Sequence, residues 1–209
     1  MVKTQMVIFD FDGTVIDSLD EELRIFNEIA SKSGYTLIDS SNKETLRAKS
    51  LRAVISEVGI PMYRVPFLLM RGRREIAKSL VSLKPFAGIR GMLRELSRKY
   101  KVGLATSNSL SNVQKFCRLH DISEFQYIEA GIGLFGKARK LRRLLNRANI
   151  APRDAIYVGD ELRDIEAAHT IGTRSIFVTW GANTKSALGG LSPDAIAETP
   201  EEIIRILAQ

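Results

Sequence analysis

The sequence predicts an α/β fold, a doubly wound, Rossmann-like parallel sheet with a small helical cap inserted after its first strand. Short apolar runs bounded by Gly, Asp or Pro alternate with segments of helical periodicity, which indicates strand–helix–strand units. Runs such as 155–158 are apolar throughout, as in strands that helices cover on both faces. The alternation fails over 18–83, where three helical patterns follow one another without a strand. We therefore expect a core formed by 1–17 and 84–209, and a cap formed by 18–83.

Five strands are expected in the core, and apolar stripes at helical spacing separate them. The expected strands are 6–9, 102–105, 126–129, 155–158 and 175–179. In the insertion, helical patterns cover 19–30, 51–58 and roughly 63–83, and Pro85 marks the return to the core. Ligands of such sheets bind at the carboxyl ends of the strands, so the residues that follow each strand are the first candidates for a site.

Composition limits the classes of protein that the chain can represent. Its 209 residues are 44% hydrophobic and carry 31 Lys and Arg against 24 Asp and Glu, a net charge of +7. No apolar run approaches the roughly 18–20 residues that span a bilayer, so we expect no membrane segment, no signal peptide and a cytoplasmic protein. The single cysteine, Cys117, has no disulfide partner and is expected to be a reduced core thiol. The basic excess fits a nucleic-acid partner, an anionic substrate or solubility alone.

The first expected strand runs directly into Asp10-Phe11-Asp12-Gly13-Thr14. In extended chain, residues two apart point to the same side, so Asp10 and Asp12 are placed together at the end of a buried strand. Two carboxylates so close need a cation or a shared proton. Gly13 permits a turn whose N–H groups can face an anion, and Thr14 adds a hydroxyl.

Later strands and helices are followed or opened by further polar groups. These are Thr106, Ser107 and Asn108 before one helix, Lys137 at the start of another, and Asp160 and Asp164 in Gly159-Asp160-Glu161-Leu162-Arg163-Asp164. Hydroxyls and N–H groups at a helix start can hold phosphate oxygens. Asp160 and Asp164, four apart, share one face of the first helical turn. The topology therefore predicts that carboxylates and one lysine gather at one edge of the sheet.

With these four motifs in order, the sequence resembles the haloacid dehalogenase-like hydrolases, in particular their phosphoglycolate phosphatase-like branch with a small helical cap. The resemblance covers essentially the whole chain. It implies that Asp10 is the nucleophile, Thr106 the hydroxyl of the second motif and Lys137 the lysine of the third. Asp160 and Asp164 are then the acids of the fourth motif.

The residue types fit phosphoryl transfer on their own chemistry. A carboxylate such as Asp10 can attack phosphorus to give an aspartyl phosphate, and Asp12 can serve as general acid and then as general base. Mg²⁺ suits an all-oxygen site; the expected metal residues are Asp10, Asp160 and the backbone carbonyl of Asp12 as ligands, with Asp164 expected to orient them. The residues expected around the substrate phosphate are Gly13, Thr14, Thr106, Ser107, Asn108 and Lys137. We therefore expect a Mg²⁺-dependent phosphatase acting on a small phosphorylated metabolite, with a phosphoglycolate-like anion as the first substrate.

Other interpretations were weighed against this one. A calcium loop starting at Asp10 fails because Val15 stands where that loop needs glycine. Haloacid dehalogenation is disfavoured because it does not need the acid/base at Asp12. A phosphomutase acting on sugar phosphates would use the same core residues and stays open. A nucleic-acid-binding protein on a retired enzyme scaffold is disfavoured because all the acidic and lysine positions are present.

Two basic groups are left undecided by the sequence. Arg71, Arg73 and Arg74 in the cap, and Lys140 with neighbouring arginines after Lys137, most simply form solvated helix faces. Recognition of a substrate anion or of an anionic partner is the alternative in each case. A monomer and a homodimer are equally compatible with the sequence.

Overall fold

The computed structural model describes residues 4–39, 41, 43–131 and 136–208. Within these residues, one sheet of six parallel strands has the order β3-β2-β1-β4-β5-β6. The strands are β1 (Met6–Phe9), β2 (Lys101–Ala105), β3 (Tyr127–Glu129), β4 (Ala155–Gly159), β5 (Arg174–Val178) and β6 (Ala195–Ala197). The strand order reverses at β1, whose two neighbours are β2 and β4. A crevice at the carboxyl ends of these three strands is the expected place for a site.

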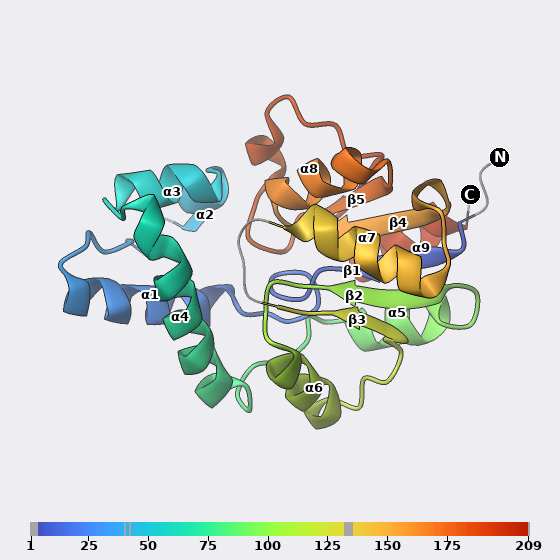
Figure 1. Ribbon diagram of the computed structural model, residues 1–209, viewed down its shortest axis with the longest axis horizontal. Helices are drawn as coiled ribbons and strands as arrows, with labels where there is room; N and C mark the ends of the chain where they lie inside the picture. Colours follow the sequence, from blue (N-terminus) through green and yellow to red (C-terminus); the bar gives the residue numbers. More distant parts are fainter. Residues whose placement is uncertain (1–3, 40, 42, 132–135, 209) are drawn as a thin grey trace.

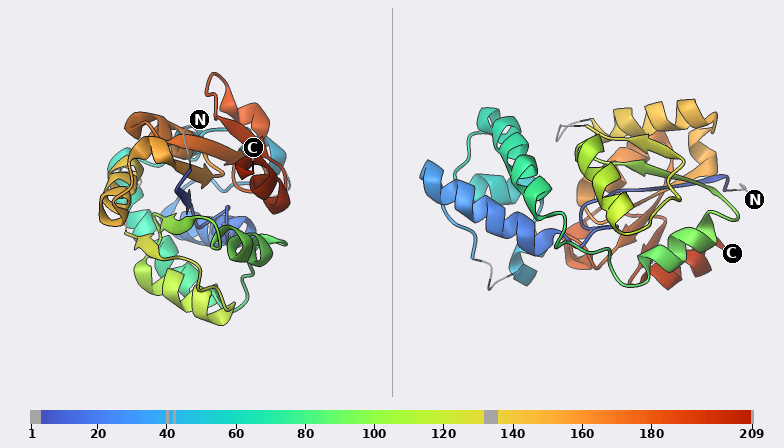
Figure 2. Two further views of the ribbon diagram at one scale, coloured as in Figure 1. Left: turned by 90° about the vertical axis from the view of Figure 1, so that its right-hand side faces the viewer. Right: turned by 90° about the horizontal axis from the view of Figure 1, so that it is seen from below.

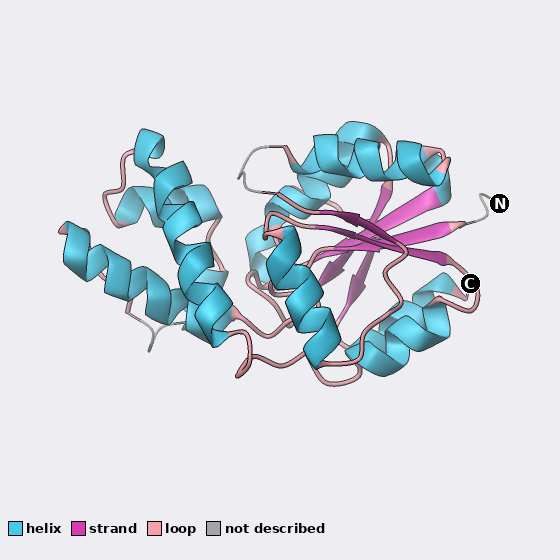
Figure 3. Ribbon diagram, turned by 60° about the horizontal axis from the view of Figure 1, so that its bottom comes forward, coloured by secondary structure: helices cyan, strands magenta, loops and turns pink. Residues whose placement is uncertain are grey.

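Helices cover both faces of the sheet (Figure 3). On one face lie α5 (Ile89–Leu96), α6 (Leu110–Leu119) and α9 (Pro200–Leu207), and on the other α7 (Lys137–Ala148) and α8 (Leu162–Ile171). Alternate residues of β1 serve the two faces: Val7 and Phe9 pack in the cluster of α5, α6 and α9, whereas Met6 and Ile8 pack with α7 and α8. The predicted doubly wound α/β fold is confirmed.

Four helices lie beyond the carboxyl ends of the strands and are called the cap helices (Figure 1, Figure 2). They are α1 (Leu19–Ser33), α2 (Lys43–Arg47), α3 (Leu51–Glu57) and α4 (Val65–Ser79). Five buried side chains form an apolar cluster of their own here: Ile38, Ile55, Val58, Ile60 and Val65. A core of their own is what a separate folding unit needs, but the division at 18–83 stays a prediction.

Short elements account for the differences from the expected secondary structure. β6 was missed because it is only three residues long, and α2 because it buries none of its five residues and so carries no apolar stripe. The third cap pattern, expected over 63–83, divides into the 3₁₀ turn η2 (Met62–Arg64) and α4. Two other 3₁₀ turns, η3 (Pro152–Asp154) and η4 (Lys185–Leu188), lie in loops of the core.

The cap helices also bear on the expectation about membranes. Among the described residues, no single helix is both long and apolar enough to cross a bilayer. Leu51–Glu57 and Met62–Ser79 pass that test of length and composition only as a pair, and a bend of 111° separates them.

Candidate active site

The carboxyl ends of β1 and β4 bring three aspartates together. Asp10 follows β1, and its N–H donates to the carbonyl of Val158 in β4 at 2.9 Å. Asp160 follows β4, and Asp164 lies one turn into α8. All three are buried, and each offers a carboxylate oxygen within 4.8 Å of the other two. The acids of the first and fourth motifs therefore meet where the topology predicted.

Lys137 at the start of α7 neutralises part of this cluster. Its Nζ donates to Asp10 Oδ2 at 2.6 Å and also to Asp164 Oδ1. Burial alone lowers the pKa of a lysine, but the charges of the two aspartates outweigh it and hold the pKa of Lys137 above its usual value. The hydroxyl of Tyr157 donates to the same Asp164 oxygen at 3.2 Å. Lys137 is thus a fixed cation between the two carboxylates.

Among the described residues, no basic side chain forms an ion pair with Asp160. Its carboxylate accepts 2.6 Å hydrogen bonds from the hydroxyl of Thr14 and from the N–H of Ala182. Burial, followed by the charges of neighbouring acids, raises its pKa well above the usual value. A set of buried carboxylate oxygens with more negative charge than Lys137 balances is the donor set of a hard divalent cation. Asp10, Asp160 and Asp164 therefore fit a metal ion.

The turn after β1 is built tightly against Asp160. Gly13 has φ +75°, and a Cβ at this position would stand 2.1 Å from Asp160 Oδ2, so only glycine fits. The hydroxyl of Thr14 was expected on the substrate phosphate, but it is committed to Asp160 Oδ1. The role expected for Thr14 at the phosphate stays a prediction; in this structure its side chain positions a carboxylate of the acidic cluster.

The carboxylate of Asp12 is not one of the three that form the acidic cluster. The side-chain amide of Asn108 donates to both of its carboxylate oxygens, at 2.9 and 3.1 Å. Burial and the negative charge of Asp10 raise the pKa of Asp12 from 3.8 to about 6. Two carboxylates with different environments at one strand end are suited to different roles, a nucleophile and a proton donor. Asn108, expected at the phosphate, is thus the residue that orients Asp12.

The other residues expected at the phosphate lie at the end of β2. The buried hydroxyl of Thr106 accepts from the N–H of Asn108 at 2.9 Å, and Ser107 lines the cavity above the cluster. Lys140 was interpreted as part of a solvated face, which is wrong. Its Nζ donates to the carbonyls of Thr106 at 2.8 Å and Gly131 at 2.6 Å, and burial lowers its pKa to about 8. Lys140 is three residues after Lys137, so helical spacing alone could have placed it on the same face.

A cavity of about 300 Å³ lies between the strand ends and the cap helices. Asp10, Asp12, Ser107 and Asn108 line its core side, and apolar side chains of α1, α3 and α4 line most of its cap side. Sequence reasoning missed Glu22 of α1 and left Arg73 of α4 undecided, yet both line this cavity. Ser18 Oγ donates to Glu22 at 2.6 Å, and burial together with the charge of Asp12 raises the pKa of Glu22 from 4.5 to about 8.

Hydrogen bonds join the cap helices to the loop after β5. The Arg47 guanidinium donates to the carbonyls of Gly181 at 2.9 Å and Thr179 at 2.6 Å. Asn183 Nδ2 donates back to the carbonyls of Arg47 at 3.0 Å and Lys49 at 2.9 Å. We call these contacts the Arg47–Asn183 clasp. The same loop supplies the Ala182 N–H to Asp160, so it touches both the cap and the acidic cluster.

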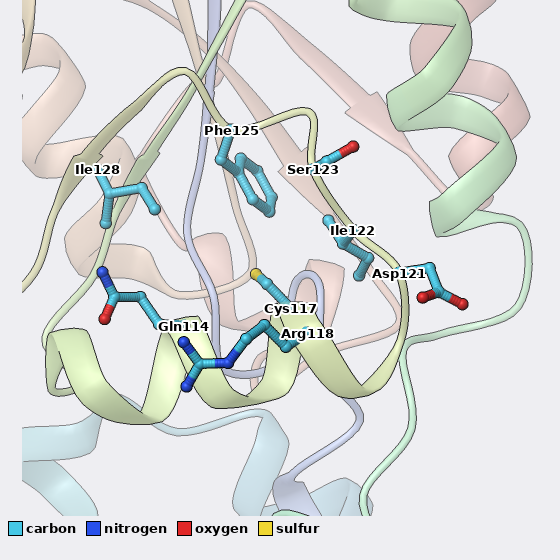
Figure 4. A pocket seen from close by; sticks show the side chains of 8 residues that line it. All are labelled: Gln114, Cys117, Arg118, Asp121, Ile122, Ser123, Phe125 and Ile128. Carbon is cyan, nitrogen blue, oxygen red and sulfur yellow. The ribbon is translucent and has the colours of Figure 1, made fainter.

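A second hollow lies between α6 and the segment that leads to β3 (Figure 4). Gln114, Cys117, Arg118 and Phe125 are among the side chains around it, and no residue of the acidic cluster takes part. Burial and the charge of Glu124 raise the pKa of the Cys117 thiol to about 11, so it carries almost no reactive thiolate at neutral pH. The candidate chemistry therefore belongs to the strand ends.

Comparison with known proteins gives the class of this molecule. The sequence matches the haloacid dehalogenase-like hydrolase family over residues 7–178, so the chain belongs to that family. It is 36% identical over 207 residues to a phosphoglycolate phosphatase of Synechococcus elongatus, with 98% of each chain covered. A pyrophosphatase of Bacillus mycoides is 22% identical, over 100% of this chain and 99% of that protein.

Solved structures agree with this assignment of the fold. A predicted phosphatase from Clostridium acetobutylicum has a TM-score of 0.84 at 22% identity, over 99% of this chain and 100% of that one. The predicted family is confirmed, and so is the predicted enzyme class, a phosphatase-type hydrolase.

Proposed function

We propose that the protein is a Mg²⁺-dependent phosphatase that hydrolyses a small phosphomonoester through an aspartyl phosphate on Asp10. One observation carries the proposal: Asp10, Asp160 and Asp164 share a buried cluster with Lys137, while Asp12 stands apart with a raised pKa. That arrangement supplies a nucleophile, a cation site and a proton donor within one strand end.

Asp10 forms the first covalent bond in this mechanism. One of its oxygens is held by Lys137, which leaves the other to attack phosphorus as the bond to the leaving oxygen breaks. Lys137 also offsets the charge that accumulates on the phosphoryl oxygens, with Thr106 and Ser107 as further ligands. The turn after β1 needs glycine at position 13, since any Cβ there would displace Asp160.

Asp12 moves the proton in both steps. Protonated, it gives its proton to the departing alcohol; deprotonated, it takes a proton from the water that hydrolyses the aspartyl phosphate. A pKa of about 6 makes both forms available near neutral pH, and the Asn108 amide keeps the carboxyl in one orientation. The raised pKa thus matches the two-step role.

The metal in this proposal is Mg²⁺, held by Asp10, Asp160 and Asp164 together with the backbone carbonyl of Asp12. Bound there, it would balance the charge of the nucleophile and of the phosphoryl group. The side chain of Asp12, bound to Asn108, is left for proton transfer.

The first substrate we propose is a phosphoglycolate-like small anion. The 36% identity to a phosphoglycolate phosphatase over nearly the whole chain supports this choice. We further propose a cytoplasmic enzyme, monomeric or homodimeric, in which 18–83 forms a cap domain over the core of 1–17 and 84–209. Closure of the cap would exclude water from the cavity.

Phosphate release from a panel of small phosphomonoesters tests the proposal. Wild type and Asp10→Asn are compared with Mg²⁺ and with EDTA, and sugar phosphates are checked for transfer of the phosphoryl group between positions. We expect release that needs Mg²⁺ and disappears in Asp10→Asn. Positional transfer without release would replace the phosphatase by a phosphomutase. No reaction with any ester would reject the proposal.

A further inference from the structure

Five cationic side chains line the cavity above the acidic cluster, and they differ in whether they have partners. They are Lys43, Arg47, Lys49, Arg73 and Arg163. Lys43 pairs with Asp20 and Lys49 with Glu57, while Arg47 pairs with Glu44 and Arg163 with Glu161. In the described part of the chain, Arg73 is the only one of the five without a carboxylate within ion-pair distance.

The Arg73 guanidinium is also short of hydrogen-bond acceptors. Its Nη1 is fully buried and donates to no described atom. Burial lowers the pKa of Arg73, and the charges of Asp12, Glu22 and Asp10 only partly oppose this. Leaving a buried charged donor unsatisfied is costly, and proteins normally pair or hydrogen-bond such groups. An anion supplied from the cavity would remove that cost.

The position of Arg73 shows which part of a substrate would meet it. The carbonyl of Arg73 accepts from Asn112 Nδ2 at 3.4 Å, and the same Nδ2 donates to Asn108 Oδ1 at 3.0 Å. Asn108 in turn holds Asp12. Among the acids, Asp12 is also the one whose charge acts most on the Arg73 guanidinium. Arg73 therefore lies on the Asp12 side of the site, where the leaving alcohol of the proposed reaction departs.

We propose that Arg73 binds a second anionic group, a carboxylate or a phosphoryl group, on the leaving-group side of the substrate. Arg73 is then the residue that selects phosphomonoesters with a second anionic group, such as those of short acids or the bisphosphates of short diols, over phosphomonoesters of neutral alcohols. The planar guanidinium suits both anions because each can accept two parallel N–H donors. This inference rests on the proposed function, since it uses Asp12 to define the leaving-group side.

Three two-carbon probes test the inference: ethyl phosphate, 2-phosphoglycolate and ethane-1,2-diol bisphosphate. Steady-state kinetics are measured for wild type, Arg73→Gln, Arg73→Lys and the control Arg74→Gln, whose residue is exposed on the same helix. Truncating a charged hydrogen bond typically costs about 10- to 100-fold. In Arg73→Gln we expect the preference for a probe with a second anionic group over ethyl phosphate to fall by that factor, mainly through KM, with partial rescue in Arg73→Lys.

The two probes with a second anionic group distinguish the chemical nature of that group. A preference for 2-phosphoglycolate identifies a carboxylate, and a preference for the bisphosphate identifies a phosphoryl group. Equal losses on all three probes would overturn the inference, because Arg73 would then serve the transferred phosphoryl group or the fold. An unchanged preference in Arg73→Gln would overturn it as well.

A binding measurement separates this inference from the proposed function. In the Asp10→Asn protein, calorimetry compares 2-phosphoglycolate and the bisphosphate with ethyl phosphate, before and after adding Arg73→Gln. We expect tighter binding of at least one of the two probes with a second anionic group than of ethyl phosphate, and loss of this difference with Arg73→Gln. If wild type hydrolyses nothing, the proposed function fails, yet this binding difference still decides the role of Arg73; no difference would reject it.

Discussion

The two sides of the cavity differ in how completely their charged groups are hydrogen-bonded. On the core side, Lys137 contacts Asp10 and Asp164, while Thr14 and Ala182 hold Asp160. On the cap side, Arg73 has a buried nitrogen without a described partner. The core side is arranged in advance for chemistry on any phosphate group, whereas the cap side has a charge left for the rest of the substrate. Reaction and selection are thus assigned to different segments of the chain.

Replacing Lys137, on the core side of the cavity, should cause the largest loss of activity. In Lys137→Met the nucleophile loses its fixed cation and the buried carboxylates are left uncompensated, so we expect kcat to fall about 10²- to 10³-fold. Arg143→Met is the matched control, because Arg143 is exposed on the same helix. Steady-state phosphate release gives the ratio. A loss below tenfold in Lys137→Met, or an equal loss in the control, would contradict the role of Lys137.

Two glycines with nearly the same φ angle, one in the core and one in the cap, allow the two regions to be compared directly. Gly13 in the core has φ +75° and Gly34 in the cap φ +73°, but only Gly13 is crowded by Asp160. We expect Gly34→Ala to cost about 1 kcal/mol of unfolding free energy, from the backbone alone. Gly13→Ala should cost about 3 kcal/mol, because the clash adds to it.

Urea unfolding of both variants, together with phosphate release, measures this difference. Activity should be retained in Gly34→Ala and lost in Gly13→Ala, since Asp160 must move to admit a methyl group. Equal stability losses in the two variants would show that the contact between Gly13 and Asp160 is not tight.

The Arg47–Asn183 clasp links the cap helices to the loop after β5, which also contacts Asp160. Weakening the clasp should therefore lower activity moderately. In Arg47→Ala two hydrogen bonds to the loop after β5 disappear, and we expect kcat/KM to fall about 3- to 10-fold. Arg24→Ala is the control: Arg24 pairs with Glu21 on the exposed face of α1, away from the clasp. An unchanged kcat/KM in Arg47→Ala would mean that the clasp has no part in closing the site.

Glu22 gives the smallest expected effect, a change in the pH dependence of stability. Burial and the charge of Asp12 raise its pKa from 4.5 to about 8, so folding takes up a proton between these values. Its contribution to stability is present below pH 4.5 and is lost as the pH rises to 8. Glu22→Gln should therefore gain stability relative to wild type as the pH rises from 5 to 8. Melting temperatures in EDTA across this range would show it; parallel curves would contradict the raised pKa.

Much of the core could be predicted from the sequence, because strand ends of a parallel sheet must meet at one edge. That rule places Asp10 and Asp160 together without knowledge of any side-chain contact. It does not say which partner a side chain takes, so neither the hydrogen bond from the Thr14 hydroxyl to Asp160 nor that from the Lys140 ammonium to the Thr106 carbonyl could be predicted. Each of these two polar groups donates to an oxygen inside the fold, whereas we expected Thr14 to contact the substrate and Lys140 to contact solvent.

The cap was less predictable for a physical reason. An amphipathic helix fixes which residues share a face, but not how the helix is rotated against another part of the fold. Arg71, Arg73 and Arg74 were therefore equivalent in sequence, and only the packing of α4 turns Arg73 toward the cavity. Glu22 gave only a weak signal, its position four residues after Ser18 in the first turn of α1.

The central claim is that Asp10 is the nucleophile and Asp12 the proton carrier, and trapping the intermediate tests it most directly. The Asp12→Asn protein is mixed with Mg²⁺ and p-nitrophenyl phosphate, whose leaving group needs little help from an acid, then quenched in acid and mapped by mass spectrometry. We expect a phosphoryl group on the peptide that contains Asp10, and none after adding Asp10→Asn. A phosphoryl group on another residue, or release of p-nitrophenol in more than one turnover without any trapped intermediate, would contradict it.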